Sequence, residues 1–379
     1  MKKVFIIGAI ILLGVAGWVT NFYYKNLRGA APAFVPSPAI NMTELPLKLP
    51  DGFSISIFAN NILNARVLTW DSMGKLLVSS PATGKILRVS QTGEVSEVVA
   101  NLNKPHGLAF KDGKLFIAET DAVSVYDYDG KATNRKKIID LPGGGNHFSR
   151  TIGFGPDGKL YISVGSSCNV CGEKNNWRAS ISQANPDGSD HRSYAYGLRN
   201  SVFFIWHPKT KKMWATEMGR DLLGDDIPPD EINIVENYGM YGPRSYGWPY
   251  CYGKQVLDAT FDSSDLAKSQ CGEASHIDLP AHSAPLGLAF IPESWGSEYA
   301  GDLLVAFHGS WNRTEPTGYK IVRFDLDENG KSKGQTDFLS GFLEGNIALG
   351  RPVDLLFDTE GNLFISDDKA GVVYRMTKQ

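Results

Sequence analysis

The chain has 379 residues, 42% of them hydrophobic, which is enough to bury either one large all-β unit or two to three smaller domains. Its formal charge is −3, and no run of Lys or Arg is long enough to follow a phosphate backbone, which argues against nucleic acid as a partner. The 40 Gly and 20 Pro follow no collagen-like period, so they indicate many tight turns and favour an all-β fold.

The N-terminus is typical of an export signal, because Lys2 and Lys3 precede an apolar stretch. That stretch is near the lower limit for spanning a bilayer, roughly 17–25 residues, and aromatic and basic residues follow it. The small-residue segment at 29–33 follows the apolar stretch, but Pro32 within it makes it a poor cleavage site. We expect residues 4–22 to tether an exported, periplasmic protein to the inner membrane; a removed signal peptide is the alternative.

A recurring unit is the strongest architectural signal. Each copy places a tight turn between two strands of period-two hydrophobicity, which is a hairpin signature. The six copies span residues 68–80, 106–120, 150–165, 203–217, 286–307 and 353–368. Radially repeated small sheets form a propeller, so we predict a six-bladed β-propeller. The expected boundaries are a signal anchor or signal peptide at 1–28, a linker at 29–45 and the propeller at 46–379.

Four cysteines in an exported chain permit disulfides. Cys251 and Cys271 bracket a polar loop that they could bridge. Cys168 and Cys171 form a Cys-x-x-Cys motif, but Gly172 follows it instead of His, so covalent haem attachment is not indicated. With no second close pair nearby, a local disulfide is favoured over zinc.

Unusual polar residues stand just before the repeated inner strands, at the end of the propeller where loops converge on the axis. They are His106, Asn146, His147, Arg150, Arg199, Asn200, His282 and Arg351. Arginine forks hold carboxylates through paired, charge-assisted hydrogen bonds, so this mouth suits a multiply anionic ligand. His147 or another of the histidines could serve as a general base.

A long insertion lies between the fourth and fifth copies, at residues 218–285. Its first part alternates Asp with Gly and Pro and so exposes carboxylates together with backbone carbonyls, as calcium requires for its roughly 6–8 oxygen ligands. The segment does not match an EF-hand. The metal-binding candidates are Gly219, Arg220, Asp226, Asp230 and Glu231.

Several motifs together resemble the quinoprotein glucose/sorbosone dehydrogenases, the soluble aldose sugar dehydrogenase group. The likeness runs from about residue 45 to the end and rests on NH (146–147), FGPDGKLYISVG, SSCNVC, YGLRN, EMGRDLLGDD, YGWPYC, HSAPLGLAF, HGSWNR and GRPVDLLF. The combination is specific, whereas each motif alone is not.

The resemblance implies a six-bladed propeller that binds pyrroloquinoline quinone and calcium on its axis and oxidises an aldose, polyol or alcohol. In such enzymes a His removes the substrate's hydroxyl proton while hydride passes to the quinone, and calcium polarises the accepting carbonyl. On the matching motifs, His147 resembles that base and Asn146 takes the place of its usual acidic neighbour. Arg199, Asn200 and Arg351 resemble cofactor contacts, and the resemblance gives backbone carbonyls of Gly219 and Arg220 to calcium.

The sequence departs from this family in three places. His106 stands where the better-known glucose enzymes have Gln, and Asn146 stands where they have Asp. Their cofactor-binding Lys has no clear match, and His308, Trp311 or Arg313 is the candidate replacement. No haem motif is present, so electrons are expected to leave to a separate acceptor, a cytochrome or a quinone. No Rossmann fingerprint follows any strand, so a nicotinamide or flavin enzyme is not indicated.

Two other functions fit the same fold, because fold does not fix function. A calcium-dependent propeller lactonase would use metal-activated water and needs carboxylate and amide ligands on the axis. A non-catalytic propeller would bind carbohydrate on exposed aromatic residues, for which Trp248, Trp295 and Trp311 are the candidates.

Overall fold

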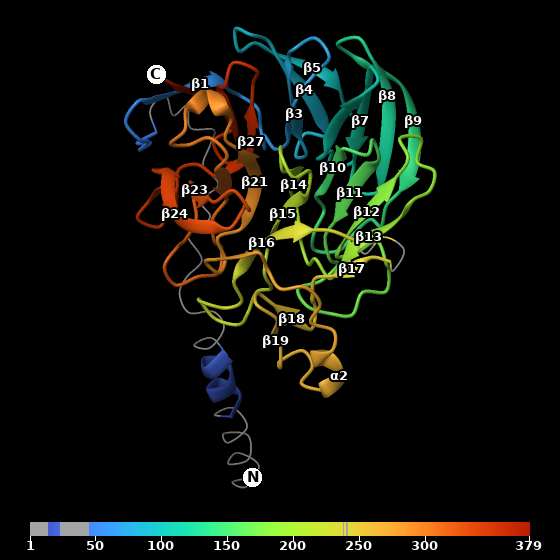
Figure 1. The fold of residues 1–379 in the computed structure, drawn as a ribbon, viewed down its shortest axis with the longest axis vertical. Helices are drawn as coiled ribbons and strands as arrows, with labels where there is room; N and C mark the ends of the chain where they lie inside the picture. Colours follow the sequence, from blue (N-terminus) through green and yellow to red (C-terminus); the bar gives the residue numbers. More distant parts are fainter. Residues whose placement is uncertain (1–13, 23–44, 238, 240–241) are drawn as a thin grey trace, which may run out of the picture.

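The computed structural model describes residues 14–22, 45–237, 239 and 242–379, and nearly all of its regular structure is β-strand (Figure 1). Six sheets of four or five strands are arranged around one axis. The innermost strands of successive sheets contact each other in order, and β27 contacts both β21 and β2, so the ring is closed. The predicted six-bladed β-propeller is confirmed.

The blades follow the chain, each from its inner to its outer strand. Blade 1 is β2 (Leu68–Trp70), β3 (Leu76–Ser80), β4 (Lys85–Val89) and β5 (Val95–Val99); blade 2 is β6 (Leu108–Lys111), β7 (Lys114–Ala118), β8 (Ala122–Tyr128) and β9 (Ala132–Asp140); blade 3 is β10 (Arg150–Phe154), β11 (Leu160–Val164), β12 (Ser180–Ala184), β13 (Arg192–Tyr196) and β17 (Arg244–Ser245). Blade 4 is β14 (Phe204–Trp206), β15 (Met213–Glu217), β16 (Asp230–Val235) and β20 (Ile277–Leu279); blade 5 is β21 (Pro285–Phe290), β22 (Leu303–Phe307), β23 (Lys320–Leu326) and β24 (Ser332–Leu339); blade 6 is β27 (Pro352–Phe357), β28 (Leu363–Asp367), β29 (Val372–Lys378) and β1 (Phe53–Ala59).

Blade 6 is built from both ends of the propeller sequence. Strand β1 pairs antiparallel with β29, from Phe53 opposite Lys378 to Ala59 opposite Val373. This pairing ties the first strand of the chain to the last, and β1 becomes the outer strand that covers the edge of β29. Figure 1 shows β1 beside the C-terminus accordingly.

In three blades an Asp carboxylate closes the turn between the inner and second strands, from two residues before the bonded N–H in blade 3 and from four residues before it in blades 1 and 6. In blade 3, the Asp157 carboxylate accepts the backbone N–H of Lys159 at 3.1 Å, and Gly158 has φ +74°, a conformation that favours glycine. Asp71 and Asp358 accept the equivalent backbone N–H groups in blades 1 and 6. The repeated Asp and Gly thus fix the hairpins that define the blades.

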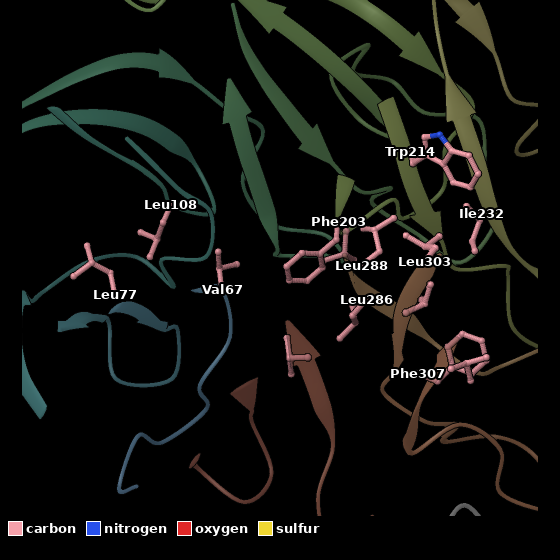
Figure 2. Close-up of a cluster of buried hydrophobic side chains, with 14 of the residues drawn as sticks. Val67, Leu77, Leu108, Phe203, Trp214, Ile232, Leu286, Leu288, Leu303 and Phe307 are labelled. Carbon is pink, nitrogen blue, oxygen red and sulfur yellow. The ribbon is translucent and has the colours of Figure 1, made fainter. Parts of the chain in front are cut away.

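The second strand of five blades is buried along its whole length, because neighbouring blades cover both of its faces. Apolar side chains from several blades meet in one cluster, drawn in Figure 2. It includes Leu77, Leu108, Trp214, Leu303 and Phe307. This core holds the ends of the inner strands in fixed positions, and the candidate site lies at those ends.

The insertion carries the hairpin of β18 (Cys251–Tyr252) and β19 (Val256–Leu257) and the short helix α2 (Asp265–Lys268). Cys251 and Cys271 are joined by a disulfide, as are Cys168 and Cys171, which confirms both expected bridges. The remaining short elements are η2 (Glu293–Trp295), β25 (Leu343–Glu344) and β26 (Ile347–Ala348).

Residues 14–22 are helical, whereas residues 1–13 and 23–44 lie outside the described residues. The expected anchor at 4–22 is therefore described only in its second half, and most of the expected linker is not described. Across the described part of the chain, no helix has the length and hydropathy needed to cross a membrane.

Candidate active site

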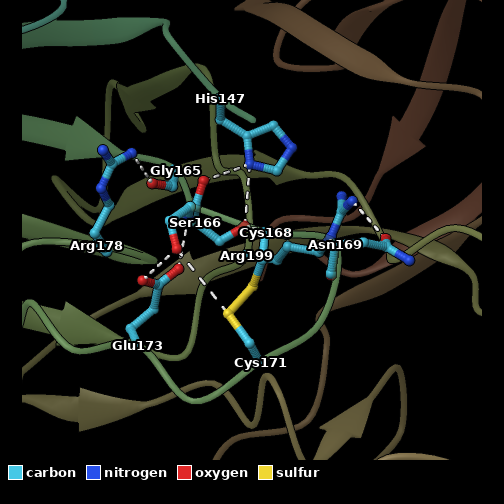
Figure 3. Close-up of a disulfide and its surroundings, with 10 residues drawn as sticks. His147, Gly165, Ser166, Cys168, Asn169, Cys171, Glu173, Arg178 and Arg199 are labelled. Carbon is cyan, nitrogen blue, oxygen red and sulfur yellow. Dashed lines mark hydrogen bonds between the residues drawn. A yellow bond between two sulfur atoms is a disulfide. The ribbon is translucent and has the colours of Figure 1, made fainter. Parts of the chain in front are cut away.

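The residues just before the inner strands do converge on the axis, and His147 has the clearest geometry among them. It precedes β10, and its Nδ1 lies 2.9 Å from the Ser166 carbonyl oxygen and 3.0 Å from the Ser166 hydroxyl (Figure 3). The Ser166 hydroxyl donates its own hydrogen to the Cys168 carbonyl at 2.6 Å. Nδ1 must therefore carry the proton that the Ser166 carbonyl accepts, which leaves a lone pair on Nε2.

The backbone around His147 is fixed by buried arginines. Arg150 has no exposed surface and donates through one nitrogen to the carbonyls of His147 and Ser149, both at 2.9 Å. Arg178 donates to the carbonyls of Gly143 and Gly144, both at 2.7 Å. Arg150, expected in the cationic mouth, thus uses its Nη1 to hold the backbone at His147 and Ser149.

The imidazole of His147 is held neutral. Burial, and after it the neighbouring positive charge of Arg199, lower the pKa of His147 from its usual value to about 3. Gly165 permits the close packing behind the ring, because a Cβ there would lie 2.8 Å from the His147 Cβ and 2.4 Å from the Asn200 Oδ1. A neutral ring with a fixed tautomer is what a general base requires.

Arg199 connects the loops of blades 3 and 4. Its Nε donates to the Asn169 carbonyl at 2.9 Å, Nη1 donates to the carbonyls of Met218 and Gly219, and Nη2 donates to the side chains of Asn169 and Asp221. Its five N–H donors are matched by five protein acceptors. The structure thus gives the predicted cofactor contact Arg199 a bracing position. Asn200 is buried beside it, with Nδ2 3.3 Å from the Met218 sulfur.

The opposite side of the axis carries a second charged group, formed by blades 1, 5 and 6. His308 Nε2 lies 2.9 Å from Asp368, which also accepts from Arg66 at 2.8 Å. Arg351 donates from Nε to the His308 carbonyl at 3.0 Å and from Nη2 to the Gly309 carbonyl at 2.6 Å. We call Arg66, His308, Arg351 and Asp368 the axial charge cluster.

The axial charge cluster has donors to spare. Arg66 Nε is buried and has no hydrogen-bond partner, and no described residue accepts from Arg351 Nη1. Asp368 stays ionised, because His308 and Arg66 oppose the effect of burial and hold its pKa below the usual range. Burial lowers the pKa of His308 to about 4, so that ring is neutral and adds no charge. The cluster then holds two positive arginines and one negative carboxylate, and its net charge is positive.

His106 and Asn146 occupy different environments from those that the sequence suggested. His106 has no exposed surface; its Nδ1 lies 3.3 Å from the Thr151 hydroxyl, and its buried Nε2 has no partner. Asn146 is exposed, and its backbone N–H, not its side chain, is bonded to the Ser167 carbonyl. The Ser166 carbonyl, in place of the residue 146 side chain, orients the His147 ring.

The expected metal ligands do not gather. Asp230 and Glu231 are adjacent on β16 and so point to opposite faces of blade 4. Asp230 accepts from the backbone N–H groups of Gly219 and Ala284, and Glu231 from that of Gly253. Burial raises the pKa of both to about 7. Asp226 is exposed and pairs with Arg313 at 2.9 Å.

Two backbone carbonyls in this loop were also expected to bind the metal. The Gly219 carbonyl already accepts from Arg199 at 2.9 Å, and the Arg220 side chain pairs with Asp258 at 2.7 Å. Within the described ranges, the one group of His, Cys, Asp and Glu side chains close enough to share an ion is Cys168, Cys171 and Glu173. Its cysteines are joined in a disulfide, so it offers no thiolates.

The loop after β22 braces the insertion. Arg313 Nη1 also donates to the Asp225 carbonyl, and Asn312 donates to Asp221 at 3.1 Å. His282 Nε2 lies 2.8 Å from the Gly224 carbonyl. Trp311, in contrast, is 56% exposed on this loop and remains available to a ligand.

Four residues central to this arrangement were not singled out from the sequence: Arg66, Ser166, Asn169 and Asp368. Arg66 stands just before the first inner strand and so shares the position of the other candidates, a signal that the repeat offered. Asp368 follows the second strand of blade 6 directly. Ser166 and Asn169 act through backbone and amide groups, for which residue type gives no distinctive signal.

Comparison with known proteins places this propeller in a family. The TrAA12-like family model matches residues 47–379, so the chain belongs to the TrAA12-like family. A relative from Borreliella burgdorferi, named only as an uncharacterized protein, is 32% identical over 87% of this chain and 90% of its own length. The pyrroloquinoline quinone-dependent pyranose dehydrogenase of Coprinopsis cinerea is 26% identical over 90% of this chain, which spans 56% of that enzyme.

A solved structure agrees with the fold. The holo form of the quinone-binding domain of the Coprinopsis cinerea pyranose dehydrogenase has a TM-score of 0.75 and 22% identity, covering 92% of this chain and 100% of that domain. The suspected kinship with quinone-dependent sugar dehydrogenases is confirmed at the level of the family.

Proposed function

We propose that this protein is a pyrroloquinoline quinone-dependent dehydrogenase that oxidises a hydroxyl group of an aldose or related polyol. The observation that carries the proposal is the neutral His147, with its proton fixed on Nδ1 and its Nε2 lone pair free, in a family whose named relatives are quinone-dependent sugar dehydrogenases. When bound, the quinone supplies the two-electron acceptor that no side chain provides.

In this proposal, His147 Nε2 takes the proton of the substrate hydroxyl. The Ser166 carbonyl stabilises the imidazolium that forms, because it accepts the Nδ1 proton throughout. The low pKa of His147 in the free protein keeps Nε2 unprotonated but makes the ring a weak base. A bound polyanion would offset the charge of Arg199 and raise that pKa towards the working range.

The axial charge cluster fits a polyanionic quinone. The unpartnered Arg66 Nε and the unused Arg351 Nη1 are the donors that a cofactor carboxylate would satisfy. His308 is linked to both arginines: it shares Asp368 with Arg66, and its carbonyl accepts from Arg351. It is therefore the best-placed substitute for the cofactor-binding Lys of the better-known glucose enzymes. Asn200 remains a candidate contact, as do the unpartnered Nε2 of the buried His106 and the exposed side chain of Asn146.

Calcium enters the proposal only together with the quinone. Ca²⁺ takes about 6–8 oxygen ligands, and the described residues bring no three carboxylates together on the axis. The Arg220 backbone carbonyl would supply one ligand, and the Gly219 carbonyl, which also accepts from Arg199, would supply another through its second lone pair. The cofactor and water would supply the remainder. We therefore expect calcium to bind weakly to the apo-protein and far more tightly once quinone is present.

The decisive experiment adds pyrroloquinoline quinone and calcium to purified apo-protein and screens aldoses, polyols and alcohols for reduction of an artificial dye. Dye reduction that requires quinone and substrate supports the proposal, and its absence with proven quinone binding contradicts it. Lactone hydrolysis without quinone would instead indicate the lactonase. Sugar binding without turnover would indicate a carbohydrate-binding propeller, in which the exposed Trp311, unlike the buried Trp295, could stack on a sugar.

We propose further that the protein is exported to the periplasm, that residues 4–22 tether it to the inner membrane, and that a separate cytochrome or quinone accepts its electrons. The two lysines before the apolar stretch support this location. The intact chain should sediment with membranes. A soluble mature form that starts near residue 34 would indicate a cleaved signal peptide instead.

A further inference from the structure

The loop closed by the Cys168–Cys171 disulfide lies between the base and the rest of the site. It follows β11 directly, and the Ser166 backbone N–H is bonded to the Arg199 carbonyl at 2.7 Å. The Ser166 hydroxyl donates to the Cys168 carbonyl at 2.6 Å, and the Ser166 carbonyl receives the His147 Nδ1 proton. The Cys168 carbonyl therefore holds Ser166 in place, and Ser166 in turn sets the tautomer of His147 (Figure 3).

Asn169, inside the disulfide loop, holds the other side. Its carbonyl and its Oδ1 each accept from Arg199 at 2.9 Å, and its Nδ2 donates to the Asp221 carbonyl at 3.0 Å. The Asp221 N–H returns a hydrogen bond to Asn169 Oδ1 at 2.8 Å. Thus one small covalent loop orients His147 from blade 3 and also anchors the arginine and the insertion loop of blade 4.

A stabilising role for the whole fold is a poor explanation for this bridge. Its cysteines are 3 residues apart, whereas Cys251 and Cys271 are 20 apart. Closing a short loop restricts the unfolded chain less than closing a long one, so Cys168–Cys171 contributes less to global stability. Both of its cysteines are half-buried, whereas in the other bridge Cys251 is 4% exposed and Cys271 is half-buried. A dithiol can therefore reach it without unfolding the propeller.

We propose that Cys168 and Cys171 are positioning residues for His147 and Arg199, and that reduction of their disulfide reversibly disables the base. A dithiol supplies two electrons and two protons: the Sγ–Sγ bond breaks, two thiols form, and the reagent is oxidised to its own disulfide. The freed loop loses its fixed carbonyls, so the Nδ1 proton is no longer held in place. The catalytic consequence rests on the proposed dehydrogenase function, but the structural consequence does not.

The structural test uses apo-protein and needs no activity. The chain has seven histidines, so the imidazole ¹⁵N signals can be resolved, and loss of one set in His147→Gln assigns that residue. In wild-type protein, His147 should be the Nδ1–H tautomer. In the folded double variant Cys168→Ser, Cys171→Ser it should become a mixture of tautomers. The matched control Cys251→Ser, Cys271→Ser should keep the wild-type signal, and a wild-type tautomer in the first variant overturns the proposal.

The activity test uses the quinone-loaded enzyme. Misplacing a catalytic group costs on the order of 10²-fold, so the Cys168/Cys171 variant should lose about 10- to 100-fold in kcat, with quinone affinity changed less. If that variant fails to fold, wild-type protein treated with dithiothreitol replaces it, with circular dichroism and thiol counting to verify a folded, reduced state. Activity should return on reoxidation. An unchanged kcat after proven reduction contradicts the proposal. If the untreated wild type is inactive but the His147 tautomer still changes in the Cys168/Cys171 variant, only the dehydrogenase function is contradicted.

Discussion

The two sides of the axis differ in how completely their charges are satisfied. On the side of blades 3 and 4, Arg150, Arg178 and Arg199 donate to backbone carbonyls and amides, and His147 has one fixed tautomer. On the side of blades 1, 5 and 6, Arg66 and Arg351 keep donors without partners. Arg150 Nε is also buried without a partner, but Arg199, which lies beside His147, has protein acceptors for all five of its N–H donors before any ligand arrives. This difference supports our proposal that proton transfer takes place on the first side and anion binding on the second.

The largest effect is expected for the base. His147→Gln keeps a side chain of similar size but cannot accept a proton from the substrate, so kcat should fall by about 10²–10⁴-fold. Quinone affinity should change little, because the anion binds on the other side. Stopped-flow reduction and quinone titration measure the two quantities separately.

Two outcomes would contradict this assignment. Full activity of quinone-loaded His147→Gln would move the role of base to His308, the other half-buried histidine of the site. A parallel fall in quinone affinity and kcat would indicate collapse of the site instead of loss of a base.

The comparison of the two sides is tested most directly by a pair of arginine variants. Arg199→Ala leaves buried acceptors without donors and should cost about 3–5 kcal/mol of unfolding free energy. Arg351→Ala should cost much less stability but weaken quinone binding by about 1.5–3 kcal/mol, the loss of a charge-assisted hydrogen bond. Chemical denaturation and quinone titration measure both variants.

The reverse pattern would overturn the division of labour between the two sides. If Arg199→Ala lost quinone affinity at unchanged stability, Arg199 would be a cofactor contact, as its motif suggested. If Arg351→Ala were destabilised instead, its bonds to the His308 and Gly309 carbonyls would be its main function.

The sequence predicted the fold better than the roles of individual residues. Strand periodicity and the repeated Asp-Gly turns are local properties, so six blades could be counted without a structure. The position before each inner strand also predicted correctly that His147 and Arg351 lie near one axis. Whether an arginine there binds a ligand or a carbonyl depends on loops from other blades, as the contacts of Arg199 with residues 169 and 218–221 show. That information is not local.

The insertion illustrates the same limit. Alternating Asp, Gly and Pro correctly indicated an ordered, turn-rich loop, but composition could not reveal that Asp230 and Glu231 point to opposite faces of β16. Nor could it reveal that Asp226 pairs with Arg313, 87 residues further along the chain. A carboxylate becomes a metal ligand only where the fold leaves its oxygens free.

A smaller effect concerns stability and pH. The pKa of His147 is about 3 in the folded protein and, as an ordinary histidine, about 6.5 in the unfolded chain. As the pH falls below 6.5, His147 is protonated in the unfolded chain but not in the folded protein. The free energy of unfolding therefore decreases, and the decrease continues until about pH 3. His147→Gln lacks this contribution. Its stability relative to wild type should rise by about 2 kcal/mol between pH 7 and pH 5.

Chemical denaturation of both proteins at each pH measures this difference. The comparison cancels the other buried groups, because His106, with its lowered pKa, and Glu217 and Asp230, with raised pKa values, titrate in both proteins. A relative stability that does not change with pH would show that the imidazole is not shielded from protons in the native state.

The smallest effect is expected for Asn146→Asp, beside the base. A carboxylate near an imidazole favours its charged form, so the His147 pKa should rise and the acidic limb of the pH–rate profile should move to higher pH. The size of the shift depends on distance and solvent. Asn146 is exposed, and His147 Nδ1 already donates to the Ser166 carbonyl, so the new charge acts through water. Exposed charge pairs contribute about 0.2–1 kcal/mol, which corresponds to a shift of about 0.1–0.7 pH unit. A shift well above one unit in the pH dependence of kcat/KM would show that the side chain of residue 146 contacts the His147 ring and replaces the Ser166 carbonyl as its partner. The Cys168–Cys171 loop would then no longer position the ring.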